Sequence, residues 1–204
     1  MSNTNTAPVK GKKVNVGTLV GIGLLTAIVV VLQFVSMSLR FGMFSITLTL
    51  VPIVVGAALY NWKAGAWLGF VFGVIVLLSG DAAAFLALNI PGTIITVIVK
   101  GTLAGLCAGL VYKLVSKKNQ IAAVLLASIT APIVNTGVFL IGSAVFFLDT
   151  ITQWAGTENV FVYMLVGLVG FNFFIELGVN LVLNPTILQI IRIGKKNNKS
   201  VSAS

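Results

Sequence analysis

Long runs of apolar residues, separated by short polar turns, divide most of the chain into six segments. The runs cover approximately Val14–Leu39, Phe44–Tyr60, Ala64–Ser79, Thr93–Val115, Ile121–Leu148 and Val160–Ile191. A helix needs about 20 mainly apolar residues to cross a bilayer, so each run is a candidate span, although the second and third are short. We therefore predict an all-α integral membrane protein, a bundle of six transmembrane helices.

The composition agrees with this class. Hydrophobic residues make up 58% of the 204 residues and charged residues only 8%. Soluble domains carry about 25% charged residues, so this chain has too little polar surface for a water-soluble fold. The mean hydropathy of +1.09 gives the same indication.

The positive charges lie mainly in every second connection and at both ends of the chain. If the N-terminus is cytoplasmic, the inner side has eleven of the thirteen cations and no acid: Lys10, Lys12, Lys13, Lys63, Lys113, Lys117, Lys118, Arg192, Lys195, Lys196 and Lys199. The positive-inside rule then predicts six spans with both termini cytoplasmic. We expect flexible basic tails over residues 1–13 and 193–204, on either side of a six-helix membrane domain over 14–192.

Small residues recur at helical spacing in three segments. Glycines four residues apart form two rows, Gly65, Gly69 and Gly73 in the third segment and Gly101, Gly105 and Gly109 in the fourth. Such rows let helix backbones approach closely, so we expect tight packing within the bundle. The first segment contains two looser pairs, Gly17 with Gly21 and Gly23 with Ala27. These either pack inside the bundle or form a patch for another membrane subunit.

Lys100 and Glu176 are charged residues deep inside apolar segments. A charge at the centre of a membrane helix costs about 2.5–3.5 kcal/mol on insertion scales, so it is tolerated where it meets a cavity, a partner charge or a substrate. One interpretation is a buried ion pair that joins two helices. The other is a ligand site enclosed by the bundle.

Further polar residues are candidates for the same site. Thr93, Thr96 and Lys100 share one helix face by their spacing. The additional candidates for substrate binding are Arg40, Asn89, Asn135 and Asn172. We predict that several of these meet Lys100 and Glu176 in a pocket open to the outside, with Phe85, Trp67 and Phe171 as apolar walls. The alternatives are an interfacial anchor for Arg40 and interhelical hydrogen bonding for Asn172.

Several kinds of chemistry have no support in the sequence. The chain has no histidine, and it lacks a G-x-x-x-x-G-K-[ST] phosphate loop and any cluster with metal-ligand spacing. There is also no serine or cysteine nucleophile with an evident base. We therefore expect a protein that is not an enzyme and that uses no cofactor and no metal.

The chain resembles the S components of energy-coupling factor (ECF) vitamin transporters over roughly Val14 to Lys196. The similarity includes the length, the six expected spans and the small residues of the first span. Two stretches are most similar to pantothenate-specific members: Phe41-Gly42-Met43-Phe44-Ser45-Ile46-Thr47-Leu48, and Leu78-Ser79-Gly80-Asp81 through Asn89-Ile90-Pro91-Gly92-Thr93.

The resemblance implies a substrate-binding subunit that captures a water-soluble vitamin, with pantothenate favoured. Its partners would be a transmembrane coupling protein and two cytoplasmic ATPases. The family's A-x-x-x-A motif, which contacts the coupling protein, would correspond to Gly23 and Ala27, although glycine replaces the first alanine and Gly17 with Gly21 is a competing match. The resemblance also favours Arg40 and Lys100 as ligands of the vitamin's carboxylate.

Three alternatives remain open from the sequence. The chain would be an S component for another vitamin, or a stand-alone or proton-coupled carrier that uses Glu176 as its proton site. It would otherwise be a structural or assembly protein of the membrane without a ligand.

Overall fold

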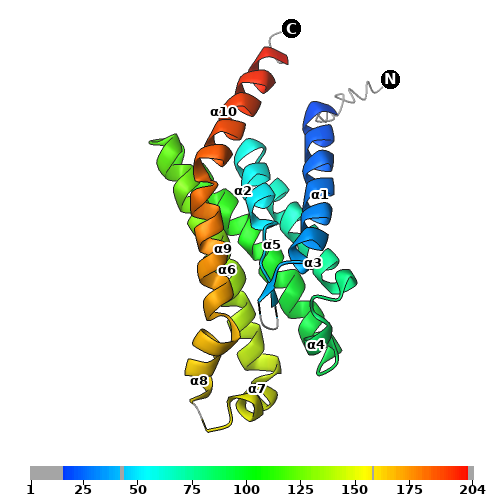
Figure 1. Cartoon of the computed structure of the whole chain (residues 1–204). Helices are drawn as coiled ribbons and strands as arrows, with labels where there is room; N and C mark the ends of the chain where they lie inside the picture. Colours follow the sequence, from blue (N-terminus) through cyan, green and yellow to red (C-terminus); the bar gives the residue numbers. More distant parts are fainter. Residues whose placement is uncertain (1–15, 42–43, 158, 202–204) are drawn as a thin grey trace, which may run out of the picture.

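The computed structural model describes residues 16–41, 44–157 and 159–201. These residues form a bundle of helices with one pair of two-residue strands, shown in Figure 1. The elements are α1 (Val16–Met37), β1 (Arg40–Phe41), β2 (Phe44–Ser45), α2 (Leu50–Leu59), α3 (Trp62–Ser79), α4 (Ala83–Leu86), α5 (Ile90–Val115), α6 (Gln120–Phe146), α7 (Leu148–Ala155), α8 (Val160–Val162), the π-helical turn η1 (Tyr163–Leu168), α9 (Gly170–Val182) and α10 (Asn184–Val201).

Within the described residues, four helices are long and apolar enough to cross a membrane: α1, α3, α5 and α6. The segment α8–η1 together with α9 makes a fifth if the two parts, bent by 43° at Val169, count as one span. The prediction of a membrane protein built from helices is therefore confirmed. Six continuous spans are not found, and the difference lies in the second and last predicted segments.

The second predicted span, Phe44–Tyr60, is only partly helical. Its first residues pair antiparallel with β1, with Arg40 opposite Ser45 and Phe41 opposite Phe44. Helix α2 then has ten residues, a length of about 15 Å, which is half the thickness of a bilayer's apolar core. Pro52 lies in the first turn of α2, where its missing N–H costs little, so the helix begins late.

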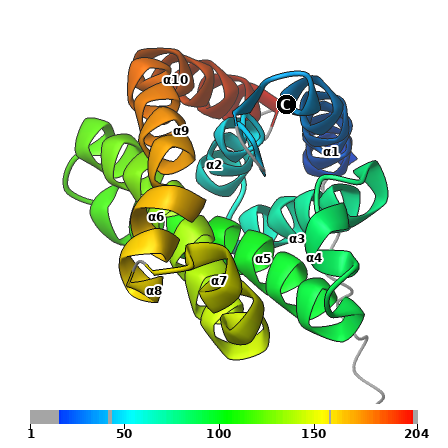
Figure 2. The same cartoon turned by 60° about the horizontal axis from the view of Figure 1, so that its bottom comes forward.

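Helix α2 lies inside the bundle, enclosed by α1, α3, α5, α6, α9 and α10 (Figure 2). Eight of its ten residues are buried. The strand pair and residues 46–49 continue from its first turn, and they occupy the part of the bundle interior that a full-length helix would have filled. This arrangement leaves room for side chains from the surrounding helices to meet below α2.

The glycine rows join α3 to α5, which confirms the predicted tight packing. A Cβ atom added at Gly69 would lie 2.0 Å from the carbonyl oxygen of Gly101, and one added at Gly105 would lie 2.0 Å from that of Gly65. Any larger residue at these positions would push the two backbones apart. The rows therefore set the distance between α3 and α5, which carry much of the site described below.

The last predicted segment, Val160–Ile191, is interrupted twice. Its chain passes through η1, bends at Val169, and passes from α9 to α10 at Leu183. Pro185 lies in the first turn of α10, as expected for a residue that starts a helix readily. Helix α10 then continues to Val201, whereas a flexible tail was expected from residue 193. Lysines are good helix formers and are favourable near a helix C-terminus, which explains the continuation.

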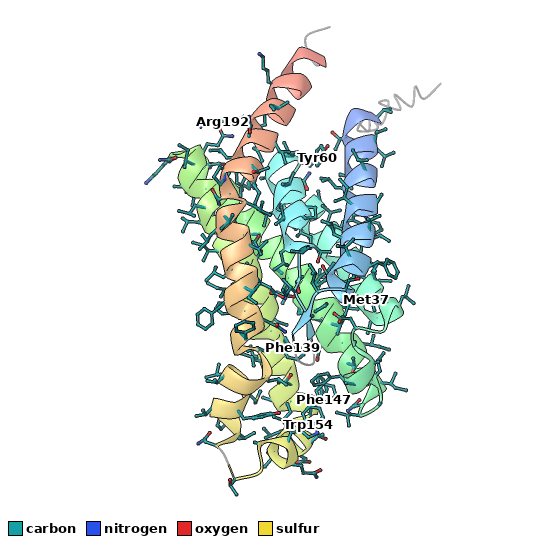
Figure 3. The ribbon with its side chains drawn as sticks, viewed as in Figure 1. Met37, Tyr60, Phe139, Phe147, Trp154 and Arg192 are labelled. Atoms are coloured by element: carbon teal, nitrogen blue, oxygen red, sulfur yellow. The ribbon has the colours of Figure 1, made fainter. Side chains whose placement is uncertain are left out.

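One end of the bundle is strongly basic. The start of α1 and the end of α10 lie at this end, together with Tyr60 and Arg192 (Figures 1 and 3). We define the basic end by the described cations Lys63, Lys113, Lys117, Lys118, Arg192, Lys195 and Lys196. Which side of the membrane the basic end faces stays a prediction.

Candidate functional site

A small cavity lies below α2, between α3, α5, α6 and α9. Its volume is about 50 Å³. One water molecule needs roughly 10–15 Å³, so the cavity has room for a few waters. Polar and aromatic side chains from several elements line it: Ser45, Thr47, Phe72, Val76, Asp81, Lys100, Asn135, Thr136, Phe139, Val169, Asn172, Phe173 and Glu176. We call this the central cavity.

Lys100 lies between the central cavity and a second, smaller one of about 30 Å³. Thr96 and Thr93, one and two turns earlier on α5, line the second cavity, so the predicted shared face is confirmed. The Lys100 ammonium is 5.3 Å from the ring centroid of Phe139 and 5.8 Å from that of Phe72. These cation–π contacts stabilise the charge without using its three hydrogen-bond donors.

The carboxylate of Glu176, which is 5% exposed, connects α9 to the loop after β2. Its Oε1 accepts a hydrogen bond from the Thr47 backbone N–H at 3.2 Å. The side chains of Thr47 and Asn135 lie next to it and interact favourably with its charge. The carboxylate interacts with the charge of Lys100, but among the described residues no direct ion pair joins the two. Lys100 and Glu176 therefore contact different groups: Lys100 lies over the rings of Phe72 and Phe139, and Glu176 accepts a hydrogen bond from the Thr47 N–H.

Asp81 makes a second connection to the same loop. Its Oδ2 accepts a hydrogen bond from the Ser45 hydroxyl at 2.7 Å and one from the Gln33 amide at 3.4 Å. The loop that carries Ser45 and Thr47 is thus attached at two points, to Asp81 after α3 and to Glu176 on α9. Both attachments use carboxylates that line the central cavity.

Some buried polar atoms near the cavities have no hydrogen-bond partner among the residues that the structure describes. They include Asn135 Oδ1, Thr96 Oγ1 and Gln33 Oε1. A buried acceptor without a partner costs about 1–3 kcal/mol, so such atoms are stable where water or a ligand supplies a donor. Asn135 lines the central cavity and Thr96 the second one, so both are available to a bound molecule.

Aromatic side chains close the cavities on the side away from the basic end. Phe85 on α4 makes edge-to-face contacts with Phe139, Phe147 and Trp154, with ring centroids 5.5, 5.0 and 6.0 Å apart. Figure 3 shows Phe139, Phe147 and Trp154 in this half of the bundle. Phe85, Phe139 and Phe147 of this cluster line the second cavity.

The structure brings four of the six predicted substrate residues into one cavity: Lys100, Asn135, Asn172 and Glu176. Asn89 instead caps α5, with its Oδ1 accepting a hydrogen bond from the Gly92 N–H at 2.9 Å. Arg40 belongs to β1 through its backbone, and its side chain lies outside the described part of the structure.

The expected apolar walls are only partly correct. Phe85 lines the second cavity, but Trp67 and Phe171 are 50% and 64% exposed and line neither cavity. The walls of the central cavity are Phe72, Phe139 and Phe173.

The main site residues that sequence reasoning missed are Asp81, Ser45 and Thr47. Asp81 had a usable signal, since it is one of only four acidic residues in the chain. Ser45 and Thr47 lie in a stretch that carries the family resemblance, but they were not proposed as ligands because that stretch overlaps a segment interpreted as a membrane helix. Their approach to the cavity depends on the strand pair replacing that helix.

Gly23 and Ala27, the expected contact with a coupling protein, lie on an exposed face of α1. A Cβ atom added at Gly23 would meet no other atom within 4 Å. Gly23 lines a groove between α1 and α3, together with Thr26 and Trp67. Of the two interpretations given for this pair, packing inside the bundle is thus excluded for Gly23.

Comparison with known proteins identifies related sequences and folds. Residues 17–188 match the family described as "ECF transporter, substrate-specific component". Among solved structures, the chain is similar to ThiT from Listeria monocytogenes, with a TM-score of 0.64 and 21% sequence identity over 89% of this chain and 96% of that one. At this identity the similarity concerns the fold. No curated protein matches the chain.

Proposed function

The chain belongs to the family of ECF transporter substrate-specific components, and on that premise we propose that its central cavity binds a small water-soluble vitamin. The chain delivers the vitamin inward together with a transmembrane coupling protein and two cytoplasmic ATPases. It is thus a binding subunit of a transporter in a bacterial cell membrane.

The observation that carries this proposal is the convergence of charged and amide side chains in one cavity. Lys100, Asn135, Asn172 and Glu176 come from three helices, and the cavity walls are aromatic. Membrane helices bury such groups at a cost, which a polar ligand offsets by hydrogen bonding to them. Specific pockets for small molecules commonly combine apolar walls with a few polar groups that fix orientation.

Pantothenate is the ligand that the sequence resemblance favours. In this proposal Lys100 binds its carboxylate, with Arg40 as a second cation. Glu176 and the amides of Asn135 and Asn172 bind its hydroxyl and amide groups. A hydrogen bond to a charged group contributes about 1.5–3 kcal/mol, so a few such bonds give useful affinity.

A cationic vitamin such as thiamine is the second candidate. Two carboxylates, Asp81 and Glu176, line the cavity beside one described cation, Lys100. The aromatic rings of Phe72, Phe139 and Phe173 also suit a cationic or aromatic ligand. The lining of the cavity therefore favours a positively charged ligand, whereas the sequence resemblance favours the anion pantothenate.

Binding requires the cavity to enlarge, because a volume of about 50 Å³ holds only a few water molecules. The loop with Ser45 and Thr47 is the segment that moves in this proposal. Its two attachments are hydrogen bonds from the Ser45 hydroxyl to Asp81 and from the Thr47 backbone N–H to Glu176. Both end on side-chain carboxylates that a ligand engages instead. The loop would then act as a lid on the vitamin.

The basic end faces the cytoplasm in this proposal, in accordance with the positive-inside rule. Both termini are then cytoplasmic, and the aromatic cluster around Phe85 faces outward. Gly23 and Ala27 on α1 contact the coupling protein, since they present a smooth exposed surface.

Calorimetric titration of the purified chain with pantothenate and with thiamine tests the ligand assignment. We expect micromolar or tighter binding of one of them, lost or strongly weakened in both Lys100→Gln and Glu176→Gln. Lys117→Gln, an exposed lysine at the basic end, is the matched control and should bind normally. If neither vitamin binds, a thermal-shift screen of other water-soluble vitamins follows, and a uniformly negative screen refutes the proposal.

Uptake into proteoliposomes tests the transport mechanism. We expect vitamin uptake only when the coupling protein and both ATPases are present with ATP. Uptake by the chain alone, driven by a pH gradient and abolished in Glu176→Gln, would instead establish the proton-coupled carrier.

A further inference from the structure

A third cavity, larger than the two described above, opens at the basic end, away from the proposed vitamin site. It lies between the α2–α3 turn, the end of α5 and α10, and its volume is about 390 Å³. Its polar and aromatic lining residues include Asn61, Trp62, Tyr112, Lys113, Ser116 and Lys195. We call this the basic cavity.

Two lysines reach the basic cavity from different helices. Lys195 on α10 donates a hydrogen bond to the Tyr112 hydroxyl at 2.8 Å, and its Nζ lies 4.8 Å from the centroid of the same ring. Tyr112 itself is 4% exposed, so this contact holds the ammonium at the cavity wall. Lys113, in the last turn of α5, supplies the second ammonium.

The described part of the chain supplies no acidic counter-ion at this end. Of its carboxylates, Asp81 lies beyond the opposite end of α3, Asp149 lies on α7, and Glu176 lines the central cavity. Lys63, Lys117 and Lys118 add further positive charge around the cavity. The combined potential of the basic end therefore favours an anion.

The remaining lining groups suit a phosphate ester attached to an apolar body. The hydroxyl of Ser116 and the side chain of Asn61 supply polar contacts next to the lysines. Ala57, Ala58 and Leu59 form an apolar wall on the same cavity, and Trp62 is a residue type favoured at membrane interfaces. A free inorganic anion would use the lysines but leave the apolar wall unused.

We propose that the basic cavity binds the headgroup phosphate of an anionic phospholipid, for which phosphatidylglycerol is the probe. Lys113 and Lys195 bind the phosphate, and Tyr112 positions Lys195. The glycerol and the first carbons of the acyl chains lie against the wall formed by Ala57, Ala58 and Leu59. Basic pockets between membrane helices are suited to this role, since each lysine near an anionic headgroup adds favourable electrostatic energy.

The test uses the full-length purified chain and measures thermal stability and lipid binding. Short-chain phosphatidylglycerol is titrated against the detergent-solubilised protein, with short-chain phosphatidylcholine and inorganic phosphate as separate arms. Native mass spectrometry counts the lipids that remain bound. We expect saturable stabilisation by phosphatidylglycerol alone.

The variants separate a defined site from general surface charge. Lys113→Gln with Lys195→Gln should weaken phosphatidylglycerol binding about 25-fold, taking roughly fivefold per lysine. Lys117→Gln with Lys118→Gln removes the same charge from exposed positions outside the cavity lining and should change binding little. Lys113→Gln alone, at an exposed position, gives about a fivefold loss if the first pair does not fold.

Three results would overturn the proposal. Equal losses in the two double variants would mean general attraction to anionic lipid, and equal stabilisation by inorganic phosphate would mean a site for a free anion. In the third, the protein shows no preference for phosphatidylglycerol, and the double variant of Lys113 and Lys195 no longer assembles with the ATPase module. That result would assign the cavity to contact with a protein partner.

Discussion

Replacing Gly69 with alanine tests the link between helix packing and the vitamin site. An alanine Cβ would lie 2.0 Å from the carbonyl oxygen of Gly101, whereas ordinary contacts begin at 3.4 Å. The helices α3 and α5 must therefore separate locally by about 1.4 Å, because the carbonyl group of Gly101 is part of a helix backbone and cannot rotate away. Lys100 precedes Gly101, so this separation also displaces a proposed ligand.

The expected loss of stability follows from two opposing effects. Overpacking a tight contact costs about 1–3 kcal/mol, while replacing glycine in a helix with alanine regains about 0.5–1 kcal/mol. We expect Gly69→Ala to lower the free energy of unfolding by about 1–2 kcal/mol. Ligand affinity should also fall, by about tenfold if one charge-assisted hydrogen bond is weakened.

The assay is unfolding in mixed micelles of dodecyl maltoside and dodecyl sulfate, followed by tryptophan fluorescence, with calorimetric titration of the vitamin. Gly23→Ala is the matched control, because a Cβ there meets no atom within 4 Å. It should leave the stability of the isolated protein unchanged or slightly raised. If Gly69→Ala is as stable as Gly23→Ala and binds normally, the glycine row does not set the helix spacing.

Other substitutions separate ligand contacts from structural ones. Lys100→Gln should weaken vitamin binding about 10- to 100-fold by calorimetry without lowering the melting temperature, since it removes a buried charge; a large drop in melting temperature would indicate a structural role. Glu176→Gln retains an acceptor for the Thr47 N–H, whereas Glu176→Leu does not. In the same unfolding assay the glutamine variant should therefore be more stable by about 1–2 kcal/mol. Equal stabilities would refute the attachment of the loop to α9 through Glu176. Asn89→Ala should lower the free energy of unfolding by about 1 kcal/mol through loss of the α5 cap, and Asn89→Ser should restore the cap and the stability. Vitamin affinity should be unchanged in both variants. A loss of affinity would instead make Asn89 a ligand.

Much of the site was predictable from the sequence because its residues break a strong local rule. Charges and amides are costly inside membrane helices, so Lys100, Asn135, Asn172 and Glu176 stood out against their apolar surroundings. The four indeed line one cavity. Asn89 was expected in the outer loop before the fourth segment, and it instead lies at the start of α5, where asparagine is a common cap.

The segment that begins with β2 shows what hydropathy does not report. Apolar residues at 44–60 indicate burial from water, and both a membrane helix and a strand pair inside a helix bundle satisfy that condition. The prediction chose the helix, and it therefore missed Ser45 and Thr47. Only the packing of the neighbouring helices leaves space for the strand pair below α2.

The sequence by itself determined the membrane class, the approximate positions of the long helices, the tight packing of the two glycine rows and the basic end of the bundle. These properties follow from local hydrophobicity, glycine spacing and charge, which need no knowledge of distant residues. The tertiary structure alone decided that Glu176 meets Thr47, 129 residues earlier in the chain, and that Asp81 meets Ser45. Such contacts depend on which elements become neighbours, and that is set by the packing of the whole bundle.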